Sequence, residues 1–495
     1  MSRRQPRIAV IGAGVAGIAA LVKLKKAGFS DVMAFERWDS PGGTWLVNDY
    51  PGCAVDIPSH LYSFSFMPWD WTRTHATQAE ILAYLQSTVA AFGIAPSIQY
   101  GTDVRSIVWS NETQRYTLTF ASGDPEDFDA VISCVGLLNQ PKHPHWPGLA
   151  DFAGPAFHTA RWEHGHDLNG KTVAVVGTGA SAAQVVPAIA PVVGQLLLFQ
   201  REAGWVLPKG DREFTEAERK AFVASPLTRR RERLRIYREM AQVVNAWREG
   251  SPLNNQLRDT CLAFISDTVE SSELRVALTP DFPYACKRVV RSDDLYHALN
   301  RTNVTLIPHA VTGLTDSAVV ANGQAYDVDI VVMATGFSAQ DFLSTIEVVG
   351  VDGRRLRDEW GDLPRALIGS TVPGFPNFFI AYGPNTNGGG SIIFQIEQSV
   401  NFAVRALRRA RRRSRIVDVR PAAYGRYEAW IDRTIEDRLH AQTQCNNYYR
   451  TGAGKNVTQW PLTHGAFRRA NWFWQYRGLR LMRRTSAAKP TPASR

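Results

Sequence analysis

Two glycine-rich loops constrain the fold of this chain more than any other feature, because each stands between a short apolar run and a predicted helix. In such a loop the first glycine permits a tight turn, the second lets the backbone approach a pyrophosphate, and the third packs the helix against the strand. The free N–H groups at the helix N-terminus then favour the anion. Each loop predicts one dinucleotide-binding unit. The loop residues are Gly12, Gly14 and Gly17 in the first unit and Gly177, Thr178, Gly179, Ser181 and Ala182 in the second.

The residue that follows the second strand of each unit predicts which nucleotide the unit binds. In the first unit a strand at 31–35 ends at Glu36, and an acid at this place hydrogen-bonds ribose hydroxyls. In the second unit the strand at 195–199 leads to Arg201, which can bind a 2′-phosphate that an acid would repel. We therefore expect an NAD-type nucleotide or FAD on the first unit and NADPH on the second. The alternative for Arg201 is an ordinary solvated arginine.

The segment FAGPAFHTARWE at 152–163 lies between the two loops and does not match a regular helix or strand. Gly154 and Pro155 break a helix, and two ring side chains, His158 and Trp162, follow four residues apart. The position of the segment predicts a joint between the two units, close to where two cofactors meet. The alternative is a polar linker with incidental aromatic residues.

A predicted loop at 41–66 follows the first unit and contains an acid between two apolar residues. This acid is Asp56, which stands between Val55 and Ile57. A buried carboxylate is costly unless it is paired. Asp56 is therefore either a turn-capping residue or a carboxylate held against a cation near a cofactor, and the place of the loop favours the second interpretation.

The basic charge of the chain does not indicate a nucleic-acid partner. The net charge is +10, and much of the excess comes from arginine-rich runs at 229–235 and 408–415. Both runs fall in predicted helices, where solvent-facing surfaces explain them better than a nucleic-acid site, since no base-reading motif accompanies them. Anionic cofactors would themselves favour a basic cleft.

The cysteines and the apolar runs indicate which cellular compartment the protein occupies. Five scattered cysteines without C-x-x-C argue against a disulfide framework and against a zinc site, and fit a reducing compartment. No window reaches 18 uninterrupted apolar residues, so no membrane span is expected. The arginines before the first apolar run resemble a signal peptide, but the glycine loop gives that run another use. We expect a cytoplasmic protein that holds no metal.

Taken together, the motifs resemble those of the Baeyer–Villiger monooxygenases, which are class B flavin monooxygenases. The resemblance covers roughly residues 7–475. One departure is Glu163, because the central motif of the family usually closes with Pro or Asp. The matching positions are Phe152, Gly154, His158, Thr159 and Trp162 in the central segment, Gly42, Gly43, Trp45, Tyr50, Pro51, Gly52 and Asp56 in the first loop, and Lys287, Arg288, Ala334, Thr335 and Gly336 further on.

The resemblance implies an α/β fold with two Rossmann-like dinucleotide-binding domains, one for FAD and one for NADPH, and a helical insertion. The length of 495 residues also exceeds what one core of about 250–300 residues holds. The expected parts are 1–145 (FAD-binding domain, first part), 146–340 (NADPH-binding domain, with the insertion at 211–275), 341–484 (FAD-binding domain, second part) and 485–495 (disordered tail).

The resemblance also implies a reaction. NADPH reduces FAD, the reduced flavin captures O2 as a C4a-peroxide, and the peroxide attacks a ketone to give an ester or lactone. An anionic oxidant and an anionic adduct both require a fixed positive charge. Arg288 is the candidate for that charge, and Asp56 would hold it in place. Lys287 and Arg201 would bind the 2′-phosphate, and His158 is assigned to coupling between the domains.

Further positions come from the same resemblance. Tyr62 and Ile392 match positions that line FAD in the family. The expected cofactor-binding set is completed by Gly43, Thr44, Trp45 and Val104.

Two other functions remain open at this point. An N- or S-oxygenating flavin monooxygenase would take a sulfide or amine, would need no Arg–Asp pair, and usually carries Tyr or Phe where Trp162 stands. A flavin- and NADPH-binding sensor without catalysis would need neither Asp56 nor Arg288.

Overall fold

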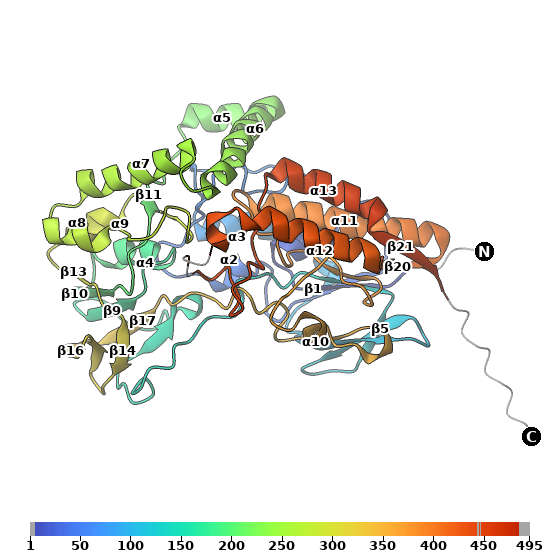
Figure 1. Cartoon of the computed structure of the whole chain (residues 1–495), viewed down its shortest axis with the longest axis horizontal. Coiled ribbons are helices and arrows are strands. Elements are labelled where there is room, and N and C mark those ends of the chain that lie inside the picture. Colours follow the sequence, from blue (N-terminus) through green and yellow to red (C-terminus); the bar gives the residue numbers. More distant parts are fainter. Residues whose placement is uncertain (1–4, 443–444, 446, 485–495) are drawn as a thin grey trace, which may run out of the picture.

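The computed structural model describes residues 5–442, 445 and 447–484. The chain forms two five-stranded parallel sheets, one in each half of the molecule, with helices packed against them (Figure 1). This arrangement confirms the α/β fold class with two Rossmann-like units. The tail expected to be disordered, 485–495, lies outside the described residues.

The first sheet is built from both ends of the chain. Its order is β19-β7-β1-β2-β3, with every pair parallel. The chain moves from β1 to β2 on one side and later to β7 on the other, so the strand order reverses at β1, which is where open α/β sheets bind ligands. Helices α1 and α11 pack together beside it. The bounds are β1 Ile8–Ile11, α1 Val15–Lys26, β2 Val32–Phe35, β3 Ile98–Gln99, β7 Ala130–Ser133, β19 Phe378–Ile380 and α11 Ile392–Arg413.

The second sheet repeats this plan, with the order β13-β10-β9-β17-β8 and all pairs parallel. The strand order reverses at β9, the strand that precedes the second glycine loop. Val10 of β1 and Val175 of β9 belong to one buried cluster, so the apolar core runs through both units. The bounds are β8 Ala156–His158, β9 Thr172–Val176, α4 Ala182–Ile189, β10 Gln195–Phe199, α9 Leu295–Leu299, β13 Val304–Ile307 and β17 Ile330–Met333.

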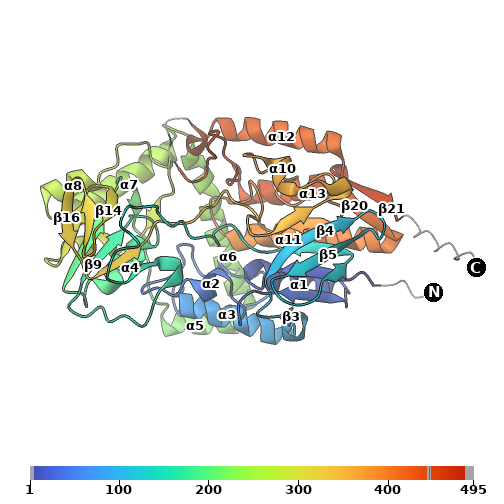
Figure 2. The same cartoon turned by 90° about the horizontal axis from the view of Figure 1, so that it is seen from below.

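Smaller elements cover the outer faces of the two units. The sheet β18-β4-β5-β6 and the meander β14-β15-β16 lie at opposite ends of the molecule (Figure 2). Their bounds are β4 Val104–Ser110, β5 Arg115–Phe120, β6 Glu126–Phe128, β14 Val311–Leu314, β15 Ala318–Ala321, β16 Gln324–Asp327 and β18 Glu347–Val349. The remaining elements include α2 Thr44–Val47, α3 Gln78–Ala91, β11 Val206–Leu207, β12 Val290–Arg291, α10 Leu356–Trp360, β20 Arg415–Val419, α12 Pro421–Glu436, α13 His464–Arg477 and β21 Leu479–Arg483.

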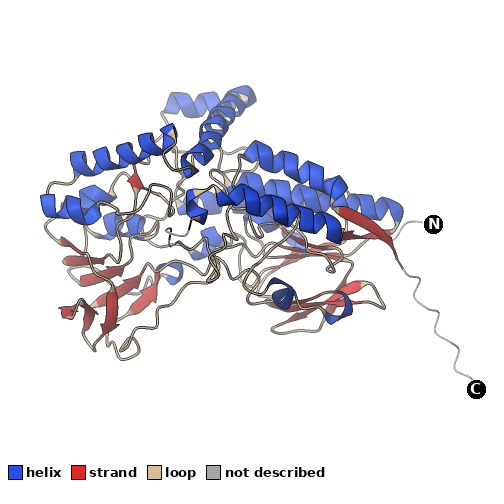
Figure 3. Cartoon of the chain, viewed as in Figure 1, coloured by secondary structure: helices blue, strands red, loops and turns tan. Residues whose placement is uncertain are grey.

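The insertion is made mainly of helices (Figure 3), and these helices begin at side-chain caps. Thr215 and Glu218 form a capping box, while Ser225 and Ser251 each cap a helix that starts with proline. The bounds are α5 Glu216–Ala224, α6 Pro226–Gln242, α7 Pro252–Thr268 and α8 Ser272–Leu278.

One arginine of the run at 229–235 departs from the expected solvent-facing role. Arg233 donates hydrogen bonds to the carbonyl oxygens of His60 and Ser63, at 2.8 and 3.0 Å, and to Ser63 Oγ at 2.9 Å. Helix α6 is thereby fixed to the loop that follows the first unit. The charge of Arg233 serves to attach the insertion to this loop.

Candidate active site

The first glycine loop is shaped by backbone contacts that leave no room for side chains. Gly12 has a φ of +97°, and a methyl group on Gly17 would lie 1.9 Å from the carbonyl oxygen of Gly12. Glu36, 5% exposed, accepts a hydrogen bond from the N–H of Ala13 at 2.6 Å. Because a carboxylate has about four acceptor positions, Glu36 can hold the loop and still accept from a ribose.

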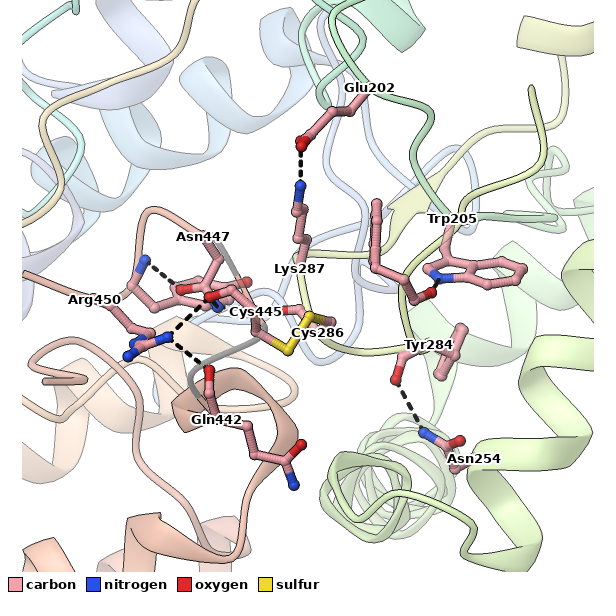
Figure 4. Close-up of a disulfide and its surroundings, with 12 residues drawn as sticks. Glu202, Trp205, Asn254, Tyr284, Cys286, Lys287, Gln442, Cys445, Asn447 and Arg450 are labelled. Carbon is pink, nitrogen blue, oxygen red and sulfur yellow. Dashed lines mark hydrogen bonds and ion pairs between the residues drawn. A yellow bond between two sulfur atoms is a disulfide. The ribbon is translucent and has the colours of Figure 1, made fainter. Parts of the chain in front are cut away.

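The second glycine loop lies against the linker at 334–336, which follows β17. Gly177 has a φ of +112°, and an added methyl group would lie 2.6 Å from the carbonyl oxygen of Ala334. Arg201 is exposed just beyond β10. Its neighbour Glu202 forms an ion pair with Lys287 (Figure 4). Lys287 therefore lies beside the residue that follows Arg201 in the chain, and Glu202 holds it there.

The structure brings Arg288 and Asp56 together across 232 residues of sequence. The guanidinium donates a hydrogen bond to the carboxylate, and the side chains are 38% and 27% exposed. Burial alone would raise the pKa of the Asp56 carboxyl, but the charge and hydrogen bond of Arg288 outweigh burial and lower it. The charge of Asp56 in turn raises the pKa of Arg288 against the effect of burial. Both groups are therefore ionised at neutral pH.

Three tyrosines lie close enough to Arg288 for its charge to affect their pKa values. Burial raises the pKa of Tyr62, Tyr382 and Tyr449, and the charge of Arg288 partly opposes that rise at all three. Tyr62 Oη also accepts a hydrogen bond from Trp45 Nε1 at 3.2 Å. Tyr62 and Trp45 belong to the predicted set. Tyr382 and Tyr449 were missed, because nothing in their local sequence indicates that they approach Arg288.

The central segment joins the second sheet as an edge strand. His158 lies opposite Met333 in the β8–β17 pair. Its Nε2–H donates to the carbonyl oxygen of Gly336 at 3.0 Å, and its Nδ1 accepts from the N–H of Ala160 at 3.0 Å. Burial, followed by the neighbouring His143, lowers the pKa of His158 to about 4. The ring of His158 is therefore neutral near pH 7, and both of its nitrogens are engaged in hydrogen bonds.

The other predicted cofactor positions lie on several elements, and Gly43 is the one shown to contact the first glycine loop. Gly43 approaches Gly14 so closely that a methyl group on Gly43 would lie 2.8 Å from the Cα of Gly14. Thr44 begins α2, and Ile392 begins α11 directly after the cap Ser391. Val104 is 2% exposed and packs in the core with Phe35, so any contact with a cofactor would come from its backbone.

The loop containing Tyr50 and Gly52 docks the first unit onto helix α4 of the second. Tyr50 Oη donates to Gln184 Oε1 at 2.9 Å, and Gln184 Nε2 donates to the carbonyl oxygen of Ala54 at 2.8 Å. A methyl group on Gly52 would lie 2.5 Å from the Gln184 carbonyl oxygen. The Tyr-Pro-Gly part of the sequence motif therefore contributes an interface between the units.

A cavity of about 630 Å³ lies beside this interface, between the Tyr50–Gly52 loop, α4 and the start of α9. Arg73, His75 and Lys209 are among its lining residues. The cavity contains neither glycine loop nor the Arg288–Asp56 pair, so we do not assign the reaction to it.

Three buried histidines predict an acid-sensitive fold. Burial lowers the pKa of His60, His158 and His464 to about 4, below the unfolded value near 6.5. The unfolded chain then binds more protons, so stability is lost as pH falls from about 6.5 toward 4, by roughly 2 kcal/mol per histidine at pH 5. We expect a lower unfolding temperature at pH 5 than at pH 7.5. An unchanged unfolding temperature would contradict these pKa values.

The structure corrects one expectation about the cysteines. Cys286 and Cys445 form a disulfide, with their Cα atoms 5.3 Å apart, while Cys53, Cys134 and Cys261 are free and buried. The partners are 159 residues apart, and no spacing rule connects cysteines that only the fold brings together. Within residues 5–442, 445 and 447–484, no helix has the length and apolarity that crossing a bilayer requires.

Two parallel-sheet units, each with a glycine loop after a central strand, together with an arginine–carboxylate pair, are typical of a protein that binds two dinucleotides. Residues 5–351 match the model of the flavin-binding monooxygenase-like family, and the chain belongs to this family. A Baeyer–Villiger monooxygenase of Streptomyces coelicolor is 38% identical over 468 residues, covering 94% of this chain and 90% of that protein. A Baeyer–Villiger monooxygenase of Pseudomonas aeruginosa is 36% identical over 463 residues, covering 92% and 88%.

Solved structures give the same result for the fold. A steroid monooxygenase bound to NADP aligns with a TM-score of 0.87 at 29% identity, covering 97% of this chain and 99% of that one. A cyclohexanone monooxygenase from Rhodococcus bound to NADP+ aligns with a TM-score of 0.85 at 28% identity, covering 98% and 100%. The resemblance inferred from the sequence motifs is confirmed.

Proposed function

We propose that this chain is an FAD- and NADPH-dependent monooxygenase that inserts one oxygen atom of O2 next to a ketone carbonyl. The balanced reaction is ketone + O2 + NADPH + H+ giving ester or lactone, NADP+ and water. The relatives named Baeyer–Villiger monooxygenases support this function over N- or S-oxygenation. The observation that carries the proposal is the ion pair of Arg288 with Asp56 beside Tyr62.

The residues present fit both cofactors. The first loop, where Gly17 and Gly43 leave no room for a methyl group, and the acceptor Glu36 suit the pyrophosphate and ribose of FAD. The second loop, with Arg201 and Lys287 close by, suits the pyrophosphate and 2′-phosphate of NADPH. When bound, NADPH supplies the electrons and FAD passes them to O2.

Each residue of the site then has a physical task. Arg288 keeps its proton and places a fixed positive charge where negative charge develops on oxygen. Asp56 orients that guanidinium. Lys287 would exchange Glu202 for the 2′-phosphate on cofactor binding, and His158 links the central segment to Gly336 of the linker.

The test is a purified preparation offered a panel of ketones and sulfides with NADPH and 18O2. We expect a yellow protein that NADPH bleaches, and a product two isotopic mass units heavier than the one formed in 16O2, with ketones as the preferred substrates. Sulfoxides in place of esters would support the N- or S-oxygenating alternative. Reduction of the flavin without any oxygenated product would support a sensor. The cytoplasmic location remains a prediction, and cell fractionation would test it.

Replacing Arg201 by alanine is expected to weaken NADPH binding far more than NADH binding. The loss of a charge-assisted phosphate contact costs about 1.5–3 kcal/mol, which raises KM for NADPH roughly 10- to 150-fold. Steady-state kinetics with both nucleotides measure this. Arg105→Ala, at an exposed arginine of β4, is the matched control. Equal losses for NADPH and NADH would show that Arg201 is an ordinary surface residue.

A further inference from the structure

The Cys286–Cys445 disulfide connects two separate parts of the site (Figure 4). Cys286 directly precedes Lys287 and Arg288 in the loop that follows the insertion. Cys445 precedes Tyr448 and belongs to a segment that comes after α12. Both cysteines are fully buried. The covalent link therefore fixes the cation-bearing loop to a distant segment of the chain.

The segment around Cys445 has its own set of anchors. Arg450 donates to the carbonyl oxygens of Gln442 at 2.6 Å and Gly454 at 2.8 Å. Gln340 Nε2 donates to the carbonyl oxygen of Tyr448 at 3.0 Å. The acceptors of these hydrogen bonds are main-chain oxygens of Gln442, Tyr448 and Gly454, which lie before and after Cys445 in the chain.

The disulfide and one hydrogen bond join the loop of Cys286 and Arg288 to the residues next to Cys445. Asn447 Nδ2 donates to the carbonyl oxygen of Cys286 at 2.8 Å, next to the disulfide (Figure 4). The phenols of Tyr448 and Tyr449 lie close enough to Arg288 for their charges to influence its pKa. Arg288 is thus held from two directions, by Asp56 at its guanidinium and by the link at Cys286 at its backbone.

We propose that Cys286 and Cys445 are positioning residues. Their disulfide keeps the backbone of Arg288 at a fixed position relative to Tyr448 and Tyr449 during turnover. This inference rests on the proposed function. A long arginine side chain has many rotamers, so its charge is placed well only if its backbone is placed well. A shift of about 1 Å in a reacting group can cost about 100-fold in rate.

Because the link is a disulfide, thiol reagents can break it and re-form it. A dithiol such as dithiothreitol breaks the S–S bond, giving two cysteine thiols and the cyclic disulfide of the reagent, with two electrons and two protons transferred. Oxidised glutathione reverses the change, as the two thiols become the disulfide and two molecules of reduced glutathione form. The reduced protein keeps the Arg288–Asp56 pair but loses the second restraint.

The experiment compares the wild type with the Cys286→Ser/Cys445→Ser double variant. Cys261→Ser is the matched control, because Cys261 is fully buried but free. Titration of the unfolded wild type should find three thiols of the five cysteines, and five after reduction. Ester formed per NADPH consumed should fall about 10-fold or more in the double variant, with a much smaller fall in the rate of flavin reduction. Cys261→Ser should keep the wild-type ratio.

Dithiol treatment gives a second route if the double variant folds poorly. Reduced wild type should show the same low ratio of ester to NADPH, oxidised glutathione should restore it, and the double variant should not respond to either reagent. A purely structural link would lower all rates together and leave the ratio unchanged, which would overturn the inference. Five thiols in the untreated protein would also overturn it. A wild type that makes no ester overturns the proposed function instead, and the positioning role falls with it.

Discussion

Arg288→Ala is expected to abolish ester formation while NADPH still reduces the flavin. The guanidinium is the fixed cation of the ion pair, and removing one group that stabilises a developing oxyanion typically lowers kcat by about 100- to 1,000-fold. Hydride transfer needs no such charge, so bleaching of the flavin by NADPH should persist. NADPH consumption, measured by absorbance, should therefore continue, whereas ester, measured by mass spectrometry, should no longer form.

Two further variants sharpen this result. Arg288→Lys keeps a positive charge but loses the planar fork that pairs with Asp56, so we expect an intermediate loss. Arg357→Ala, at an exposed arginine of α10, should behave as wild type. Ester formation by Arg288→Ala at the wild-type rate would remove Arg288 from the reaction and leave the family resemblance without its catalytic cation.

The parts of the fold that the sequence predicted are those whose signals are local. A strand, a glycine loop and a helix follow one another within about 20 residues, so each unit can be inferred from its own stretch. The helices of the insertion also begin at local signals, the side-chain caps Thr215, Ser225 and Ser251, which our sequence analysis did not use. The strands expected at 31–35 and 195–199 agree with β2 to within one residue and with β10.

The contacts that the sequence did not reveal connect residues far apart in the chain. The disulfide of Cys286 with Cys445, the approach of Tyr449 to Arg288, and the bonds of Arg233 to the loop at His60 all depend on the tertiary fold. No periodicity or spacing encodes such pairs. The proximity of Asp56 to Arg288 was expected only because a family resemblance supplied it.

Gly17→Ala is expected to remove FAD from the protein, although the third place of such a loop commonly accepts alanine. The reason is specific to the first unit. The added methyl group would lie 1.9 Å from the Gly12 carbonyl oxygen, which is main chain and cannot rotate away. Helix α1 would have to move off β1, and the N–H groups aimed at the pyrophosphate would move with it. Flavin absorbance per protein should fall to near zero.

The second unit supplies the matched control, because Ala182 occupies the corresponding place at the start of α4 and is fully buried there. Ala182→Gly removes a methyl group that the second unit already accommodates, so FAD content should stay at the wild-type level. Circular dichroism distinguishes a folded, flavin-free Gly17→Ala protein from an unfolded one. Full flavin content in Gly17→Ala would mean that the first loop tolerates a displaced helix. The close contact between Gly12 and Gly17 would then not be what shapes the FAD site.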